Sequence, residues 1–344
     1  MLTRSLGSFI NAMTAQDYTV YPVSSSNEKD LQNLMSVYLD AVFYPNVLKD
    51  KNIFMQEGWR YDLFTSDSPL TVNGVVYNEM KGYYSDPSWI LNDAIKNSLF
   101  PDSSAKWESG GKPEEIVNLT WEKLVETHKK YYTPSNSYIV LYGNLEILKY
   151  LEYIDSNYFS KFEKSYVDTT VQPQVHFTEM QTYEATYPVA IDSDTTRKSY
   201  LSLNFVTGTI GQKDDNVGLS FLCYLLAGPA NSPLQVALQK NPIDDSISCS
   251  YSLSSLQPVL SITAQNADPE SADKFQKMVM DVLTDISENG FDEDYLSSAF
   301  SSYDMSYRVQ NLMPMKGLSM AMNATAAWVY DVDPTMYFET ASSI

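Results

Sequence analysis

Residues 161–188 lack the regular spacing of apolar side chains that marks helices and strands, and they contain Pro173 and Pro188. Segments of this kind usually connect domains, because few packed contacts cross them. Strongly patterned helices lie on both sides of the segment, so each side can bury a core of its own. The sequence therefore predicts two domains, residues 1–160 and 189–344, joined by a linker over 161–188.

The first predicted domain alternates strands and helices. Residues 8–23 are expected to form two strands around a polar turn. Residues 27–43 are expected to form a helix, because their apolar side chains fall on one stripe and Ser26 or Asn27 can cap its first turn. Further helices are predicted within 51–58 and over 81–100 (interrupted at Asp86-Pro87), 121–132 and 145–159. Further strands are predicted over 59–64, in the run that ends near Glu79, and over 137–142.

The second predicted domain has a similar order of elements. Gly290 is expected to end a long helix over 269–288. The other predicted elements are a strand over 199–206, helices over 215–226, 233–240 and 293–310, and paired strands over 246–254 and 259–264. Short paired strands with separate helices predict the α+β class, with a mainly antiparallel sheet covered by helices in each domain.

Charge and cysteine usage limit the classes of function. The net charge of −20 argues against nucleic-acid binding, which needs a basic face. The same charge could attract cationic ligands, or serve solubility alone. No apolar run approaches the roughly 20 residues that span a bilayer. Cys223 and Cys249 are the only cysteines; they make no disulfide scaffold, and a reducing compartment is inferred.

Several short segments carry a family resemblance when they are taken together and in order. They are Ser5-Leu6-Gly7-Ser8-Phe9-Ile10-Asn11-Ala12-Met13-Thr14, Gln56-Glu57-Gly58-Trp59-Arg60-Tyr61, Gly74-Val75-Val76-Tyr77-Asn78-Glu79-Met80-Lys81-Gly82, Ser109-Gly110-Gly111-Lys112-Pro113, Leu141-Tyr142-Gly143-Asn144 and Gly228-Pro229-Ala230-Asn231-Ser232-Pro233. This set resembles the presequence-protease branch of the pitrilysin/insulinase metallopeptidase family. The resemblance implies two homologous metallopeptidase-type domains: the remainder of a catalytic domain in 1–160 and a second, non-catalytic one in 189–344.

The resemblance implies that Glu79 is the third ligand of a catalytic zinc ion. The other two ligands and the general base of the family come from a His-x-x-Glu-His motif, which is absent from this sequence. His128 and His176, the only histidines, lack that spacing. We expect a solvated or packed side chain for His128 and assign no role to His176, which lies in the linker. Catalytic zinc takes three protein ligands, so the zinc site is expected to be incomplete in this chain, with the general base upstream. The alternative for Glu79 is a surface carboxylate at the start of a helix.

Phe9, Asn11, Ala12 and Met13 are the candidate substrate-binding residues, by the same resemblance. The matching strand lies at a sheet edge, where an extended peptide adds a further strand. Asn11 and Ala12 correspond to positions that hold the substrate backbone, and Phe9 and Met13 would shape pockets, although Met13 replaces the aromatic residue usual there. An ordinary buried hairpin strand is the alternative.

The resemblance implies a zinc metalloendopeptidase of the presequence-protease type that degrades short unfolded peptides, with this chain inactive alone. The expected partners are unfolded peptides, including basic ones, a missing amino-terminal segment and a carboxy-terminal half, with no nucleic acid and no membrane. The expected compartment is a mitochondrial-type organelle matrix or the cytoplasm. A non-catalytic peptide-binding or scaffold subunit of a split metallopeptidase and an unrelated α+β binding module are the alternatives. The missing amino-terminal segment would contribute strands and a helix to the first domain. Its absence is expected to leave an apolar face uncovered and a sheet edge unpaired, which predicts poor solubility or oligomerisation.

Overall fold

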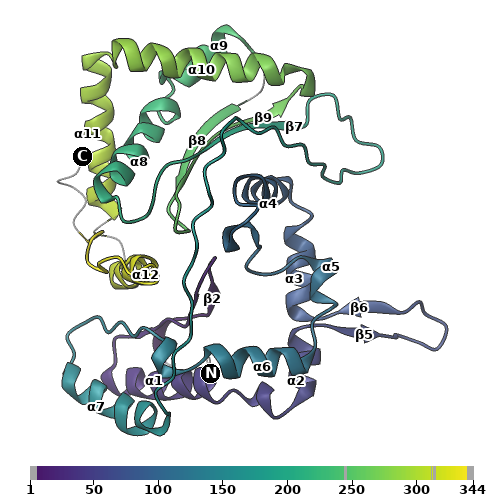
Figure 1. The fold of residues 1–344 in the computed structure, drawn as a ribbon, viewed down its shortest axis with the longest axis vertical. Helices are drawn as coiled ribbons and strands as arrows, with labels where there is room; N and C mark the ends of the chain where they lie inside the picture. The colour runs from purple at the N-terminus through teal and green to yellow at the C-terminus, as the bar shows by residue number, and fades with distance from the viewer. Residues whose placement is uncertain (1–5, 244–245, 311, 313–314, 339–344) are drawn as a thin grey trace. The chain divides into compact units, whose positions relative to one another are not determined.

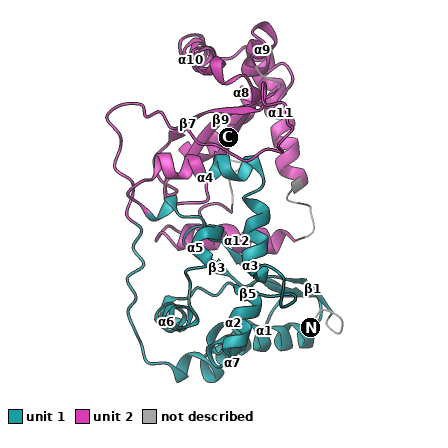
Figure 2. Ribbon diagram, turned by 90° about the vertical axis from the view of Figure 1, so that its right-hand side faces the viewer, with its two compact units in different colours: residues 1–93, 104–171 teal, residues 94–103, 172–344 magenta. Residues whose placement is uncertain are grey.

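The computed structural model of the chain describes residues 6–243, 246–310, 312 and 315–338 (Figure 1). Ser5, the first residue of the segment with the predicted peptide-binding strand, lies outside the described residues. The chain divides into two compact units: residues 1–93 with 104–171 form unit 1, and residues 94–103 with 172–344 form unit 2 (Figure 2). Both units combine helices with small antiparallel sheets, which confirms the predicted α+β class.

The strands of unit 1 form three separate two-stranded antiparallel ribbons among the described residues. They are β1 (Gly7–Ile10) with β4 (Val23–Ser25), β2 (Met13–Thr14) with β3 (Thr19–Val20), and β5 (Arg60–Asp62) with β6 (Thr71–Asn73). In the first ribbon Phe9 pairs with Ser24 and Ile10 with Val23. The β5–β6 hairpin projects from its unit in Figure 1.

The helices of unit 1 begin and end largely where local sequence signals place them. They are α1 (Glu28–Phe43), α2 (Lys51–Glu57), α3 (Val75–Tyr83), α4 (Pro87–Leu99, which continues into unit 2), α5 (Pro113–Ile116), α6 (Trp121–Tyr131) and α7 (Ile147–Asn157), with 3-10 turns at Asn46–Leu48, Ser104–Lys106, Pro134–Asn136 and Phe159–Lys161. The Asn27 side chain accepts a 3.0 Å hydrogen bond from the backbone N–H of Asp30. Asn27 is thus the N-cap, one of the two predicted candidates, and it satisfies one of the free donors of the first turn.

Helices α1 and α7 pack together in the core of unit 1. Leu34 and Phe43 of α1 are buried, as are Tyr150 and Ile154 of α7. The hydroxyl of Tyr158, just after α7, donates a 2.9 Å hydrogen bond to the carboxylate of Asp40 in α1. Because its acceptor is charged, this hydrogen bond is strong and fixes how α1 and the end of α7 are aligned.

Unit 2 is built on a three-stranded antiparallel sheet in the order β7–β9–β8. The strands are β7 (Ser199–Val206), β8 (Ser246–Ser252) and β9 (Val259–Ala267), and the helices are α8 (Lys213–Ala227), α9 (Pro233–Lys240), α10 (Ala272–Asn289), α11 (Glu293–Gln310) and α12 (Lys316–Trp328), with a 3-10 turn at Pro269–Ser271. Alternate β9 residues Leu260, Ile262 and Ala264 are buried and join one core with Phe275 and Val279 of α10. Every second side chain of β9 thus packs against the apolar stripe of α10. This agrees with the side-chain periods of a strand and a helix.

The segment between α7 and β7 is held by side chains instead of a sheet. Residues 162–198, all described, contain no helix or strand. The backbone N–H of Gln174 donates to the side-chain oxygen of Gln257 at 2.6 Å, and the Gln257 amide donates back to the Gln174 carbonyl at 3.3 Å. Both residues are buried, so these bonds satisfy polar groups that water cannot reach.

Two predicted strands are wrong. The run that was expected to be a strand ending at Glu79 is helix α3 from Val75 onward. Residues 137–142 belong to none of the described strands. At α3, tertiary context outweighs the β propensity of Val75, Val76 and Tyr77. Helices α5 and α12 were not predicted.

Candidate functional site

Glu79 is the fifth residue of α3, and its side chain is exposed. The carboxylate has no hydrogen bond or ion pair within the part of the chain that the structure describes. The first turn of α3 contains no acidic residue, so Glu79 lies beyond the turn where a carboxylate stabilises a helix start. The Glu79 carboxylate is therefore available to bind a ligand.

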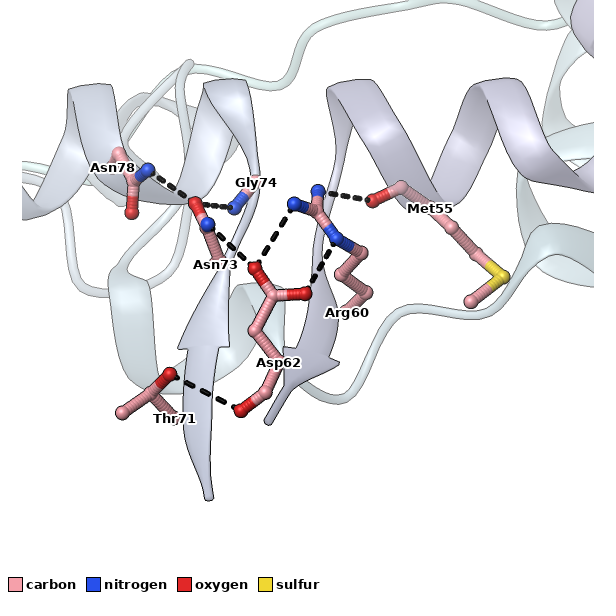
Figure 3. A network of polar contacts seen from close by, with 7 residues as sticks. All are labelled: Met55, Arg60, Asp62, Thr71, Asn73, Gly74 and Asn78. Atoms are coloured by element: carbon pink, nitrogen blue, oxygen red, sulfur yellow. Dashed lines mark hydrogen bonds and ion pairs between the residues drawn. The ribbon is translucent and has the colours of Figure 1, made fainter. Parts of the chain in front are cut away.

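A polar network fixes the start of α3 (Figure 3). The side-chain oxygen of Asn73 accepts hydrogen bonds from the Gly74 backbone N–H at 2.8 Å and from the Asn78 amide at 2.7 Å. The Asn73 amide in turn donates to the Asp62 carboxylate at 2.7 Å. Arg60 donates two hydrogen bonds, of 2.9 and 3.0 Å, to the same carboxylate. Bidentate pairs of this kind fix the relative orientation of the two groups and also strengthen their interaction.

This network changes the proton affinity of its central acid. The hydrogen bonds from Asn73 and Arg60 lower the pKa of Asp62 below its usual value, because they stabilise the ionised carboxylate. Arg60 also donates to the backbone carbonyl of Met55 in α2 at 3.3 Å. The charged cluster therefore ties α2, the β5–β6 hairpin and α3 into one local framework.

The buried side of α3 and its C-terminal end are held in place as well. Met80, which follows Glu79, is buried, and its sulfur lies so close to Gly110 that a Cβ on that glycine would approach it to 2.2 Å. After α3, the Tyr84 hydroxyl and the Lys112 ammonium donate to the carboxylate of Asp93 at 3.2 and 2.8 Å. Burial and the Asp93 charge raise the pKa of Tyr84. The side of α3 that bears Met80 is thus anchored, while Glu79 is left exposed.

The four candidate substrate-binding residues lie along β1, β2 and the turn between these strands. Phe9 and Met13 are half-buried, and Asn11 and Ala12 are exposed. The backbone N–H of Asn11 donates to the Pro22 carbonyl at 3.2 Å, so it faces β4. Because backbone groups alternate along a strand, those of Ile10 and Ala12 face the opposite edge.

The Asn11 side chain occupies part of that opposite edge. Its oxygen accepts a 2.9 Å hydrogen bond from the backbone N–H of Ala12. This is an exposed bond between neighbouring residues, and an incoming peptide carbonyl could replace it. Ile10 and Ala12, and not Asn11, therefore have their backbone donors on this edge.

The structure does not join Glu79 to this segment by any hydrogen bond or ion pair between described residues. The β2–β3 turn is instead held by Gln16, whose amide donates to the carbonyls of Ser104 and Trp107 at 2.8 and 2.9 Å. Residues 104–107 lead directly to Gly110 and its contact with Met80. Neither Gln16 nor the Asp62 network stands out in the sequence, because both depend on tertiary contacts.

His128 takes a packed position, which is one of the two expected for it, and His176 is exposed. The His128 ring is half-buried, lies 2.7 Å through Nε2 from the Val42 carbonyl oxygen, and stacks on Tyr132 with centroids 4.4 Å apart. Burial lowers the pKa of His128. His176 is exposed in the segment between α7 and β7.

The described residues do not by themselves form a zinc site. They contain no group of three or more His, Cys, Asp or Glu side chains that could hold a metal ion. Catalytic zinc needs three protein ligands, so Glu79 can supply at most part of such a site. Among the described helices, none is long and apolar enough to cross a bilayer.

Sequence comparison identifies relatives over the whole chain. A model of the peptidase M16 inactive domain matches residues 118–303. Protein HypA of Clostridium perfringens is 42% identical over 340 residues, covering 98% of this chain and 35% of the relative. Presequence protease 1, chloroplastic/mitochondrial, of Arabidopsis thaliana is 35% identical over 342 residues, covering 97% of this chain and 31% of the relative. The chain thus spans about a third of the length of these relatives.

Solved structures share the fold at low sequence identity. A protease from Helicobacter pylori matches with a TM-score of 0.70 at 16% identity, covering 99% of this chain and 76% of that one. The peptidase M16 inactive domain from Pseudomonas fluorescens matches with a TM-score of 0.63 at 16% identity, covering 97% and 74%. The family model covers more than half of the 344 residues, which rules out an unrelated α+β module. The chain belongs to the peptidase M16 family, in the presequence-protease branch of the pitrilysin/insulinase metallopeptidases.

Proposed function

We propose that this chain is part of a zinc metalloendopeptidase of the presequence-protease type, which degrades short unfolded peptides. The observation that carries the proposal is the 35% identity to a presequence protease over 97% of the chain. The exposed, unpartnered carboxylate of Glu79 on an otherwise anchored helix supports its assignment as a zinc ligand.

Each element of the proposed site has a separate task. Zinc, when bound, would make a water molecule nucleophilic at neutral pH. Glu79 would supply one oxygen ligand, and the Asp62 network would hold α3 so that this oxygen keeps its position. Ile10 and Ala12 would hold an extended peptide by main-chain hydrogen bonds, and Phe9 and Met13 would contact its side chains.

The chain alone is proposed to be inactive, because its described residues lack a three-ligand metal group. The partners we propose are an amino-terminal segment with the two histidines and the general base, a carboxy-terminal half, and unfolded peptides. The net charge of −20 favours basic peptides, since a negatively charged surface concentrates cations. A mitochondrial-type matrix or the cytoplasm is the proposed compartment.

A scaffold or peptide-binding subunit of a split metallopeptidase is the second candidate. The match of residues 118–303 to an inactive-domain model favours it. The reading frame upstream of Met1 separates the candidates: a His-x-x-Glu-His motif encoded there supports the peptidase. An upstream region without this motif, and no separate subunit that supplies it, would favour the scaffold.

The decisive assay uses the chain extended by a segment that carries His-x-x-Glu-His, loaded with zinc and given a fluorogenic basic peptide. Glu79→Gln should lower kcat/KM by at least about 100-fold, because a ligand contributes no less than the groups that support ligands. Glu152→Gln is the matched control, since Glu152 is likewise an exposed glutamate within a helix. Equal activity of the two variants would contradict the role of Glu79.

A further inference from the structure

The two cysteines of the chain meet in the core of unit 2. Cys223 lies on α8 and Cys249 on β8, and their sulfur atoms are 2.8 Å apart. Cys223 is 5% exposed and Cys249 is half-buried, and both are free thiols. The residues are 26 positions apart in the sequence, so only the packing of α8 on β8 brings them together.

A cavity opens beside the sulfur pair. Its volume is about 330 Å³, and both cysteines line it. The remaining lining comes from the same two elements and the residue after α8, and includes the side chains of Tyr224 and Tyr251. A small molecule in this cavity could therefore reach sulfur that is otherwise covered by the core.

We propose that Cys223 and Cys249 are a redox-active dithiol that a small-molecule disulfide oxidises to an intramolecular disulfide between α8 and β8. The proposal concerns unit 2 alone and is independent of the proposed peptidase function. A reducing environment would return the pair to thiols, so the modification would be reversible.

The reaction balances with one small-molecule disulfide. The Cys249 thiol loses its proton, its sulfur attacks the reagent, the reagent S–S bond breaks and one small thiol leaves. The Cys223 thiol then loses its proton, attacks the Cys249 sulfur and expels the second small thiol. Two protein thiols become one disulfide, and one small-molecule disulfide becomes two thiols.

The geometry suits this second step. A disulfide has its sulfur atoms about 2.05 Å apart, so the pair must close by roughly 0.8 Å from its present separation of 2.8 Å. Both cysteines belong to regular elements that contribute to one core, which keeps the sulfur atoms near each other. The hydrogen bond with Cys223 raises the pKa of the Cys249 thiol, and burial raises it further.

The test titrates the folded full chain with mixtures of oxidised and reduced glutathione, quenches with acid, alkylates the remaining thiols and measures the mass. The expected product has lost two hydrogen atoms and accepts no alkylating reagent. The disulfide should form at an oxidised-to-reduced ratio at least tenfold lower than in denaturant, because the fold holds the thiols together. The oxidised chain should also melt roughly 5–10 °C higher.

The matched controls are Cys223→Ser and Cys249→Ser, which keep the size and shape of each side chain. Neither should gain melting temperature on oxidation, and Cys249→Ser should react more slowly because Cys223 is the more buried thiol. The proposal is wrong if the folded wild type gives only mixed disulfides with glutathione. It is equally wrong if the folded chain needs as much oxidant as the denatured chain. If the purified chain associates, the thiols can be alkylated in a crude lysate instead, with the same mass readout.

Discussion

The backbone carbonyl of Gly58 occupies the space that a side chain on Gly74 would need. A Cβ atom on Gly74 would lie 2.1 Å from the Gly58 carbonyl oxygen and 2.7 Å from its carbonyl carbon. The Tyr77 backbone N–H donates to the same oxygen at 3.3 Å. The end of α2 and the start of α3 are therefore in direct backbone contact, and that contact positions Glu79.

Gly74→Ala should destabilise unit 1 by about 3 kcal/mol, because backbone atoms cannot move aside as flexible side chains do. The free energy of unfolding in urea would be followed by tryptophan fluorescence. This signal reports mainly on unit 1, which contains Trp59, Trp89, Trp107 and Trp121. Gly82→Ala is the matched control within α3: a Cβ there has no neighbour within 4 Å, so helix propensity should stabilise it by up to about 1 kcal/mol. Similar losses in both variants would count against the backbone contact.

The stability of unit 1 should depend on the ionisation of Asp62. Its pKa is lowered in the folded state, relative to an unfolded value of about 3.9. A carboxyl of this kind stabilises the fold above the unfolded pKa and loses that contribution as the pH falls through the folded pKa. Asp62→Asn should therefore lower the melting temperature at pH 7, and its difference from the wild type should shrink below about pH 4. Asp67→Asn, in the exposed tip of the same hairpin, should show no such dependence; a constant difference for Asp62→Asn would refute the prediction.

Ala12→Pro should weaken binding of an extended peptide, because proline removes the N–H that faces the open edge of β1. Loss of one main-chain hydrogen bond predicts roughly a three- to tenfold rise in Kd, measurable by fluorescence anisotropy with a labelled basic peptide. Asn11→Ala is the matched control. It keeps every backbone donor and removes the side chain that competes for the Ala12 N–H, so the Kd should stay within twofold or fall. The opposite ranking of the two variants would place the peptide elsewhere.

The isolated chain should associate as its concentration rises. Residues 137–142 belong to none of the described strands, and Tyr138, Val140 and Tyr142 are exposed. Exposed apolar side chains gathered on one short segment favour association. Val140→Lys should lower the associated fraction in light scattering after size-exclusion chromatography, whereas Val175→Lys, at an exposed site of unit 2, should change it little. A wild-type chain that stays monomeric at all concentrations would contradict this prediction.

Elements with strong local signals were predictable from the sequence. Helix α1 combines an apolar stripe with the Asn27 cap, and α10 combines a stripe with Gly290, whose φ of 74° suits glycine. Strands β8 and β9 pair as expected. In each case the period, the cap or the turn residue acts within a few positions of the element that it defines.

Elements that depend on distant contacts were not predictable. Val75 and Val76 favour a strand, but the contact between Gly58 and Gly74 and the burial of Met80 make a helix. The anchoring of Gln16 at Ser104 spans 88 positions, and the two cysteines meet only through the packing of α8 on β8. The identity of Glu79 as a candidate ligand came from family resemblance, whereas its exposed position in a helix came only from the structure.

In the proposed enzyme, Glu79 supplies one ligand of a zinc site which this chain cannot complete. Calorimetric titration with zinc tests it directly, on the chain alone and on the chain extended by a His-x-x-Glu-His segment. We expect no tight binding by the chain alone and one tightly bound zinc ion in the extended chain. Glu79→Gln should lower the affinity at least roughly tenfold, and Glu152→Gln should not. Tight equimolar binding by the chain alone, or unchanged affinity in Glu79→Gln, would contradict it.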